Sequence, residues 1–587
     1  MKKKYIISAV MVGASLVACD DVLEPAIENT MDITAINTNP SMAMGLLGNA
    51  YVLLPYGGTP ETDLATDDAV SNQSSNQYRT MATGSWTSIN NPISRWQNCY
   101  HAIQYINLLL ENTDNVEYAS TEPLRTLFND NIKGECYAMR GMFHFYLLQA
   151  HAGYVGGTLM GIPYHTASEN AASDFNQPRL TYVETLARIN EDFDKALEYL
   201  PTHFGNVAES EIPAKYKELG ASLNDYNRAF GDNHKGKVDG LIVKTIKAQM
   251  EFMSASPAYE ASGVTYAQAA KSLANVLASI DGLNGLDPTG HTWFANTKDI
   301  DKLATNENPQ EVLWRSGNAN NNTIETDNYP PSLYGSGRVN PTQNLVDAFP
   351  MANGYPITDA ASGYDANKPY EGRDPRFYAA IIYNGAAQGV NNTAIDVTTT
   401  SATLDGINKE NEKSTRTGYY MKKLTRPDVN LNPSSSTTQI HYTPRIRFTE
   451  LFLDYAEAAN EAYGPTDDGG NGYSAYDVIK AIRHRALGID DDPYLESIKA
   501  DKDAMRQLIR NERRLEFCFE NKRFWDLRRW KVDISSLNAT AKGVSITGES
   551  YKIINVDTRN YKDYQYYGPI PYSELQKFSA LEQNQGW

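Results

Sequence analysis

The sequence predicts a mainly α-helical protein, in which tetratricopeptide-like helix pairs form a scaffold with long loop-rich insertions. Apolar residues recur every three or four positions along several segments, as they do on the buried face of an amphipathic helix. This periodicity is lost between residues 284 and 440, where Asn, Thr, Gly, Pro and Tyr dominate. Because no Pro/Ser linker divides the 587 residues, we expect one compact domain over residues 19–587.

Two blocks of the chain, mainly residues 40–283 and 444–530, carry the helical scaffold. The clearest start signal is the capping box of Thr181 and Glu184, and Pro201 ends the same helix. We predict helices over residues 96–110, 132–147, 182–200, 241–256, 266–280, 446–463, 473–487 and 504–520. Small residues at apparent helix crossings favour tetratricopeptide-like pairs, although the match to the repeat consensus is loose; these are Ala138, Gly141, Ala248, Ala456 and Ala458.

Residues 1–18 are typical of a lipoprotein signal peptide. Three lysines follow Met1, and the apolar core after them is shorter than the roughly 20 residues of a membrane-spanning helix. Residues 16–19, Leu-Val-Ala-Cys, resemble a bacterial lipobox, which implies cleavage before Cys19 and acylation of that residue. The alternative is an ordinary secreted protein with a chance cysteine near its cleavage site.

Charge and cysteine content exclude several classes of function. The net charge of −18 repels nucleic acid and anionic lipid headgroups, so we expect no nucleic-acid partner. With Cys19 acylated, Cys99, Cys136 and Cys518 remain, an odd and widely spaced set that indicates neither a disulfide framework nor a zinc site. We predict that all three are small buried residues.

Several segments, in order along the chain, resemble the RagB/SusD family of Bacteroidetes nutrient-binding lipoproteins. The most specific is residues 510–530, Arg-Asn-Glu-Arg-Arg-Leu-Glu-Phe at its start, which looks like the signature helix of the family. The others are residues 138–145, 373–377, 447–458, 482–488, 569–571 and 583–587. The resemblance implies a SusD-like helical fold and an outer-membrane lipoprotein facing the cell exterior. It also implies that the protein caps a SusC-like TonB-dependent transporter as a hinged lid.

The charged residues of the signature segment are better explained as structure than as catalysis. Glu512, Glu516 and Glu520 lie one turn apart, and Arg513, Arg514 and Arg523 are available as partners. Cations beside a carboxylate lower its pKa, whereas an acid/base catalyst needs a pKa near neutrality. We therefore predict an ion-pair network.

A first candidate ligand region precedes the first long helix. Sugars present flat apolar faces ringed by hydroxyls, so a binder needs aromatic platforms together with polar side chains. This region supplies Asp67, Asp68, Tyr78 and Trp86, and no apolar stripe buries Trp86. In SusD-like proteins the region before the first helix pair contributes to the ligand site, so Trp86 is the first choice. A core position for Trp86 is the alternative.

The loop-rich insertion, residues 284–440, supplies a second candidate region, because long loops in compact domains usually bind something. Its candidates are Trp293, Tyr329, Tyr334 and Arg338, with the two tyrosines flanking a rigid Pro-Pro turn. Arg373 lies beside this region and could either contact ligand or pair with an acid. Simple loop packing is the alternative for each of them.

The function expected from these features is capture of an extracellular glycan and its delivery to the transporter, without catalysis. No G-x-S-x-G, H-E-x-x-H or P-loop motif occurs, although two carboxylates would suffice for a surface glycoside hydrolase. A peptide-binding lipoprotein of the same transport class is the main alternative, and a scaffold for a protein partner is the third. We expect no cofactor, and a structural Ca²⁺ at residues 467–472 stays open because EF-hand spacing is absent.

Overall fold

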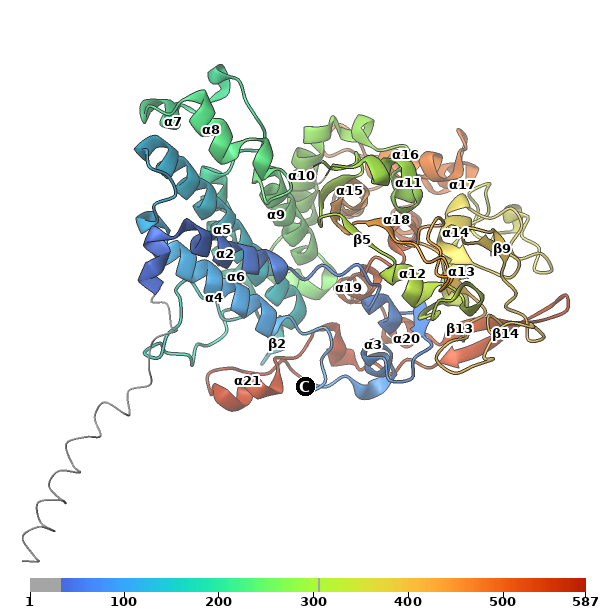
Figure 1. Ribbon diagram of the computed structural model, residues 1–587. Helices are drawn as coiled ribbons and strands as arrows, with labels where there is room; N and C mark the ends of the chain where they lie inside the picture. Colours follow the sequence, from blue (N-terminus) through green and yellow to red (C-terminus); the bar gives the residue numbers. More distant parts are fainter. Residues whose placement is uncertain (1–32, 305–306) are drawn as a thin grey trace, which may run out of the picture.

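The helices of the first block pack on one another in chain order (Figure 1). They are α2 (Pro40–Val52), α4 (Trp96–Asn112), α5 (Glu122–His151), α6 (Tyr182–Tyr199), α9 (Gly240–Ser254) and α10 (Tyr266–Leu277). The computed structural model describes residues 33–304 and 307–587. Within it, α2 contacts α4, α4 contacts α5, α5 contacts α6, α6 contacts α9, and α9 contacts α10. Such stepwise packing is typical of stacked helical pairs.

The second block continues the same helical body. Its main helices are α15 (Phe448–Tyr463), α16 (Ala475–Leu487), α18 (Lys502–Phe517) and α19 (Arg523–Arg529). Helix α10 packs along α15, and α15 in turn contacts α16 and α18. One large apolar core therefore runs from α2 to α18, so the insertion is bridged by direct contact between the helices before and after it.

The remaining elements are short. The strands of the described residues pair two by two, in antiparallel ladders of β1 (Ala69–Ser71) with β6 (Val339–Pro341), β2 (Gly153–Val155) with β3 (Thr158–Met160), β4 (Val312–Arg315) with β12 (Pro444–Arg447), β5 (Ala319–Asn321) with β11 (Gln439–His441), β7 (Ile381–Ile382) with β10 (Tyr420–Met421), β8 (Ala387–Gln388) with β9 (Thr393–Ala394), and β13 (Ala541–Thr547) with β14 (Ser550–Asp557). The short helices are α3 (Gln77–Thr80), α7 (Ala214–Glu218), α8 (Leu223–Phe230), α11 (Thr297–Lys302), α12 (Thr323–Asn328), α13 (Gln343–Ala348), α14 (Pro375–Ala380), α17 (Pro493–Ile498), α20 (Ile534–Leu537) and α21 (Tyr572–Lys577).

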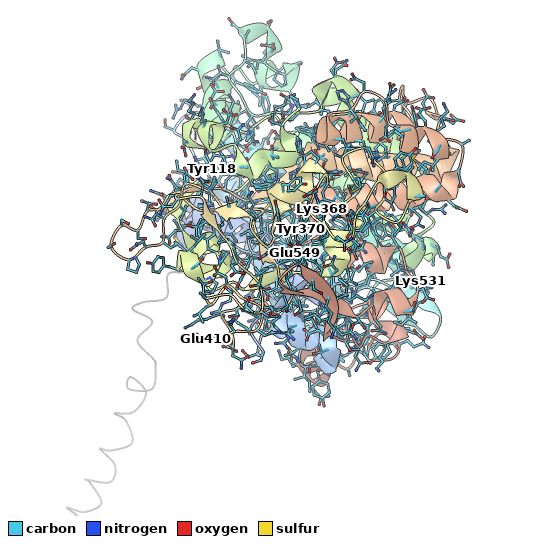
Figure 2. The ribbon with its side chains drawn as sticks, turned by 90° about the vertical axis from the view of Figure 1, so that its right-hand side faces the viewer. Tyr118, Lys368, Tyr370, Glu410, Lys531 and Glu549 are labelled. Atoms are coloured by element: carbon cyan, nitrogen blue, oxygen red, sulfur yellow. The ribbon has the colours of Figure 1, made fainter. Side chains whose placement is uncertain are left out.

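A second apolar core lies under the loops of the insertion. It collects side chains from residues 64–93, 339–397, 419–421 and 515–561. The β13–β14 hairpin covers one side of it, and the rings of Tyr370 and Tyr551 meet with centroids 5.8 Å apart. Figure 2 labels Tyr370 and also Glu549, which lies at the turn of this hairpin. The irregular loops are therefore anchored on a core of their own.

The predicted scaffold of helices is confirmed, with differences at individual ends. Thr181 and Glu184 form the expected capping box at the start of α6. Helix α5 begins at Glu122, ten residues before the predicted start, because Pro123 in its first turn is compatible with a helical N-terminus. The small residues at the expected crossings are fully buried.

The signature segment is two helices, not one. Helix α18 ends at Phe517, and α19 begins at Arg523. Between them Phe519 and Asn521 have positive φ angles of 65° and 60°. The backbone N–H of Asn521 donates to the buried Asp63 carboxylate at 2.8 Å. This long-range bond stabilises a break that helical periodicity does not indicate.

Cys99, Cys136 and Cys518 are buried free thiols, as predicted. The predicted signal peptide and Cys19 lie outside the described residues. None of the helices within residues 33–304 and 307–587 has the length and apolar character needed to cross a membrane.

Candidate ligand-binding face

The two candidate ligand regions of the sequence meet through β1 and β6. Val70 is paired with Asn340, and Ser71 with Val339. Beyond the ladder, the backbone N–H of Asn72 donates to the Arg338 carbonyl oxygen at 3.3 Å, and the Asn72 amide donates to the Ser336 carbonyl oxygen at 2.9 Å. The loop after β1 and the loop before β6 therefore lie side by side.

Tyr334 is the exposed aromatic residue of this junction. Its side chain is 55% exposed, and its backbone is left-handed with φ 66°. The N–H groups of Leu333 and Tyr334 donate to the carbonyl oxygens of Pro330 and Pro331, so a tight proline turn fixes the backbone from which the exposed ring projects. A rigid exposed ring loses little conformational entropy when a ligand stacks on it.

Two further loops of the insertion pack against the Tyr334 loop. The backbone N–H of Ser332 donates to the Asp405 carboxylate at 2.8 Å. A Cβ atom at Gly389 would lie 3.2 Å from the Leu333 side chain, so the 389 loop is in close contact too. Next to these contacts, Val390 and Leu404 are exposed apolar residues. We call the surface formed by Tyr334, Val390, Leu404 and the polar groups beside them the candidate face.

Polar side chains border the candidate face. The Arg338 guanidinium donates to the Glu412 carbonyl oxygen at 2.8 Å, and the Ser74 hydroxyl donates to the Glu412 carboxylate at 3.2 Å. Burial raises the pKa of the Asp327 carboxyl above its ordinary value, while the positive charge of Arg338 acts in the opposite direction. Charged donors and acceptors thus lie on the same loop as Tyr334 and on the loop of Glu412 that contacts it, and an aromatic ring with such groups is the combination that sugar faces and sugar hydroxyls require.

Unusual backbone conformations gather in the same loops. Among the described residues, nine that are not glycine have positive φ angles, and four of them are Tyr334, Asn392, Asn408 and Glu412. Such conformations cost free energy and are concentrated at functional sites in proteins. Their clustering here favours a ligand-binding role for the three loops.

An arginine pair braces the edge of this region. The Arg79 and Arg416 guanidinium groups donate to the Asp557 carboxylate at 3.1 Å and 2.7 Å. Burial would raise the pKa of the Asp557 carboxyl, but the two arginines outweigh it and lower that pKa. Arg416 also donates to the Ser71 carbonyl oxygen, which ties β14 to β1.

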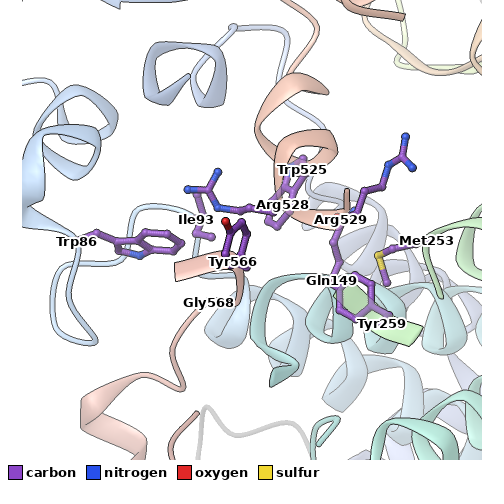
Figure 3. A pocket seen from close by; sticks show the side chains of 10 residues that line it. All are labelled: Trp86, Ile93, Gln149, Met253, Tyr259, Trp525, Arg528, Arg529, Tyr566 and Gly568. Atoms are coloured by element: carbon purple, nitrogen blue, oxygen red, sulfur yellow. The ribbon is translucent and has the colours of Figure 1, made fainter. Parts of the chain in front are cut away.

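The structure places Trp86 in the core and not on a ligand face. Its side chain is 2% exposed and its ring contacts Trp587 at 4.9 Å between centroids. The cavity beside it is about 20 Å³, room for about one water molecule, and Arg528 covers the ring at 5.2 Å (Figure 3). A ring so enclosed offers no surface to a sugar.

The polar candidates near Trp86 are also structural. Tyr78 is buried, and its hydroxyl donates to Glu61 at 2.9 Å. Asp67 accepts hydrogen bonds from Arg514 and Arg523. Although burial acts to raise it, these two guanidinium groups lower the pKa of the Asp67 carboxyl. Asp68 is fully buried and pairs with Arg514. The two acids and the Tyr78 hydroxyl therefore each have a protein partner.

Three candidates of the insertion are buried as well. Trp293 belongs to a small apolar cluster and lies against Tyr442. The Tyr329 hydroxyl donates to the Arg426 carbonyl oxygen at 2.5 Å. Arg373 donates to the carbonyl oxygens of Val346 and Phe349 at 2.6 Å and 2.7 Å, so it ties loops together, and it forms no ion pair with an acid in the described part of the chain. Of the predicted site residues, the structure brings Tyr334 and Arg338 together at the surface.

The ion-pair network of the signature segment is present, but its partners are different from those predicted. Glu516 pairs with Arg376 at 3.0 Å and with Arg485 at 3.2 Å, and Glu512 pairs with Arg483 at 2.9 Å. Burial would raise the pKa of Glu516, yet the surrounding arginines lower it. Arg513 and Arg514 bind other acids, Asp526 and Asp68 among them. A lowered pKa is unsuited to acid/base catalysis at neutral pH.

Val390, Leu404, Ser74 and Glu412 are parts of the face that the sequence did not indicate. Isolated apolar residues in polar loops, such as Leu404 after the Thr-rich run that ends at Thr403, are a weak signal.

The glycine-rich turn of Asp467 and Asp468 is closed by backbone N–H groups of Gly469 and Gly470. Among the described residues, no group of three His, Cys, Asp or Glu side chains is arranged to hold a metal ion.

Comparison with known proteins gives two family matches. The model of the SusD family matches residues 296–587, and a model described as starch-binding, associating with the outer membrane, matches residues 41–213. A SusD-like protein of Formosa agariphila is 24% identical over 311 residues, and the match spans 49% of this chain and 50% of that protein. The chain thus spans about half the length of this curated relative.

Solved structures share the fold over nearly the whole chain. A SusD-like protein of Bacteroides fragilis has a TM-score of 0.71 and 21% identity, and covers 96% of this chain and 100% of its own. A SusD-like carbohydrate-binding protein of the same species has a TM-score of 0.67 and 19% identity, covering 93% of this chain and 100% of its own. At these identities the likeness concerns the fold alone.

Proposed function

The chain belongs to the SusD/RagB family, and on that premise we propose that it captures an extracellular glycan and delivers it to a SusC-like TonB-dependent transporter. The observation that carries the proposal is the pair of family matches over residues 41–213 and 296–587, one of which is described as starch-binding. The fold shared with a carbohydrate-binding protein supports the same ligand class. In this proposal the protein is located at the outer membrane, faces the cell exterior and is anchored by a lipid on Cys19.

We place the glycan on the candidate face. Tyr334 supplies an exposed ring that can cover an apolar sugar face, and the Arg338 guanidinium and the Glu412 carboxylate, whose loops are joined by a hydrogen bond, can bind hydroxyl groups. The acid-rich surface of the protein, with net charge −18, favours neutral glycans over anionic ones. Binding without cleavage is supported by the paired carboxylates of the signature segment, which are committed to arginines and so do not form an acid/base pair.

Calorimetric titration of the purified protein tests the ligand class and the site together. The titrants are maltoheptaose, xylohexaose, laminarihexaose and, for the alternative class, pentaalanine. We expect one of the oligosaccharides to bind, and Tyr334→Ala to weaken it by about tenfold, which corresponds to about 1.4 kcal/mol. Tyr334→Phe keeps the ring and retains most of the affinity if stacking on the ring drives binding.

Val183→Ala on α6 is the matched control, since Val183 is exposed to a similar extent and lies outside the face. Both alanine variants keep the melting temperature of the parent, because an exposed side chain contributes little to packing. Binding of pentaalanine without any oligosaccharide would replace the glycan by a peptide. If Tyr334→Ala bound the oligosaccharide with the same affinity as the parent, the ligand would not bind at the candidate face. Release of reducing ends from the oligosaccharide would establish hydrolysis.

A further inference from the structure

A second cavity, of about 490 Å³, lies between α4, the loop of residues 163–177 and α21. Its size falls within the roughly 300–1,000 Å³ of small-molecule sites. In Figure 1, α21 and α4 stand on one side of the molecule, and α12 and α13, which flank the Tyr334 loop, stand on the other. The cavity is therefore separate from the candidate face, and we call it the α4–α21 groove.

The walls of the α4–α21 groove are fixed by hydrogen bonds. The Gln104 side chain exchanges two bonds with the backbone of Glu169, at 3.0 Å and 2.8 Å. The Asn107 amide donates to the carbonyl oxygens of residues 165 and 167. On the far side, the N–H of Ala580 donates to the Asn176 side chain at 2.8 Å. Both walls are thus held in place without a ligand, so little ordering entropy is lost on binding.

Aromatic side chains line the groove. Phe175, from the 163–177 loop, is 42% exposed, and Phe578, which follows α21, is half-buried. Tyr100 and Trp96 on α4 lie edge to face, with ring centroids 4.9 Å apart. The 163–177 loop, α4 and α21 each bring an aromatic ring to the cavity or its border, as a site for a flat apolar surface requires.

The polar groups of the groove favour a neutral ligand. Its carboxylates already have side-chain partners, since Glu169 lies 2.8 Å from the imidazole of His165 and Glu574 lies 2.9 Å from the ammonium group of Lys577. Gln97 and, one helical turn later, His101 are exposed, and their side chains make no hydrogen bond to the described part of the chain. Uncommitted amide and imidazole groups beside aromatic rings can bind hydroxyls, and no uncommitted cation lines the groove among the residues described.

A peptide would be matched less well. An extended peptide is recognised along the open edge of a strand, whereas the groove is walled by helices and a loop. An amphipathic helix needs a continuous apolar surface, and here Gln97, Gln104 and Gln177 interrupt it. The lining therefore fits a polyhydroxylated ligand better than a polypeptide.

We propose that the α4–α21 groove is a second carbohydrate-binding site, which takes a neutral glycan segment independently of the candidate face. This inference rests on the proposed function, because it assumes that the protein meets a glycan. Two separate sites on one body let a long polymer engage twice, and its second contact then becomes intramolecular. Capture of a polymer gains affinity in this way without any tighter single site.

Site-resolved fluorine NMR tests the proposal. The purified protein carries 5-fluorotryptophan at its seven tryptophans, and Trp96→Phe assigns the resonance of the groove. We expect maltoheptaose, xylohexaose or laminarihexaose to shift the Trp96 resonance, while trigalacturonic acid, an anionic oligosaccharide, does not. Phe175→Ala weakens this response by about tenfold, or about 1.4 kcal/mol. Leu219→Ala, at a similarly exposed side chain that follows α7, leaves it unchanged.

Several outcomes overturn the groove site. The site is ruled out if none of the three neutral oligosaccharides shifts the Trp96 resonance at millimolar concentration. It is also ruled out if Phe175→Ala does not weaken the shift, or if pentaalanine alone causes one. The Tyr334→Ala variant separates this proposal from the proposed function. If Tyr334→Ala abolishes oligosaccharide binding and the Trp96 resonance does not shift in the parent protein, the proposed function stands and the groove is not a binding site. A Trp96 shift that persists in Tyr334→Ala keeps the groove as an independent site.

Discussion

Buried carboxyl groups at the base of the first candidate region differ in their chemistry. Asp63 has no exposed surface, and one of its carboxylate oxygens has no hydrogen-bond partner. Burial, together with the nearby charge of Asp68, raises the pKa of the Asp63 carboxyl to about 7. Asp67, four residues later, is held ionised by Arg514 and Arg523. Neighbouring acids thus make opposite contributions to the pH dependence of stability.

Asp63→Asn is predicted to stabilise the protein more at pH 8 than at pH 4.5. Between about pH 4 and pH 7 the unfolded chain releases the Asp63 proton while the folded chain keeps it, so stability falls as pH rises through this window. The asparagine removes that loss, which is at most about 4 kcal/mol. Melting temperatures of parent and variant at the two pH values measure the effect.

Asp67→Asn is the control of opposite sign. The pKa of Asp67 is lowered in the folded state, so its stabilising contribution is present at neutral pH and is lost in acid. Below about pH 4 the unfolded chain takes up the Asp67 proton while the folded chain does not, so the variant loses more stability at about pH 7 than at about pH 2. If Asp63→Asn changed the melting temperature equally at pH 4.5 and pH 8, the raised pKa of Asp63 would be wrong.

Helix crossings depend on small residues whose neighbours are rigid. At Gly141 in α5, a Cβ atom would lie 2.7 Å and 2.9 Å from two ring carbons of Phe193 in α6. The Phe193 ring is fully buried, so it has no space into which to move. In α2, by contrast, Gly45 and Gly48 have no other atom within 4 Å of such a Cβ.

Gly141→Ala is predicted to destabilise the protein by up to about 2 kcal/mol, because overpacking at the α5–α6 crossing costs about 1–3 kcal/mol and the helix preference of alanine offsets part of it. Alanine favours a helix over glycine by about 1 kcal/mol, so the net loss shows that packing outweighs propensity. Gly45→Ala, where the space is open, gains up to about 1 kcal/mol for the same reason. Urea unfolding of both variants measures the difference, and equal effects in α2 and α5 would contradict the close approach of Phe193.

The whole molecule is held together by contacts between distant parts of the chain. Helix α10 packs on α15 across the insertion, and the C-terminal segment returns to the first block. There the Asn584 amide donates to the carbonyl oxygens of His151 and Gly568, at 3.0 Å and 2.7 Å. Trp587 closes over Trp86. These ties make the loops of the candidate face part of one body with the helices.

Attachment of this body to the membrane is predicted to depend on Cys19. Each buried methylene of an acyl chain contributes about 0.8 kcal/mol, so several chains on one residue give a firm anchor. Cys19→Ala is expected to abolish labelling with palmitate and to move the protein out of the membrane fraction. Asp20→Ala is the control and stays with the membrane. Retention of Cys19→Ala in the membrane fraction would show that a different attachment operates.

The sequence by itself determined the elements of the scaffold. Helical periodicity, the Thr181–Glu184 capping box and the small residues at crossings are local properties, and they predicted α6, α9, α10 and the later helices to within a few residues. Burial of the three cysteines and the existence of an ion-pair network were also predictable. Family membership followed from ordered motifs, because these record many local constraints at once.

Only the tertiary structure decided which residues meet. Trp86 is in the core because Phe524, Tyr561 and Trp587, more than 400 positions later in the chain, close around it. Glu516 forms its ion pairs with Arg376 and Arg485 and not with the arginines of its own helix. The candidate face exists because β1 pairs with β6 and three loops pack together. Partners distant in sequence leave no local periodicity, and burial is decided by the free energy of the assembled core.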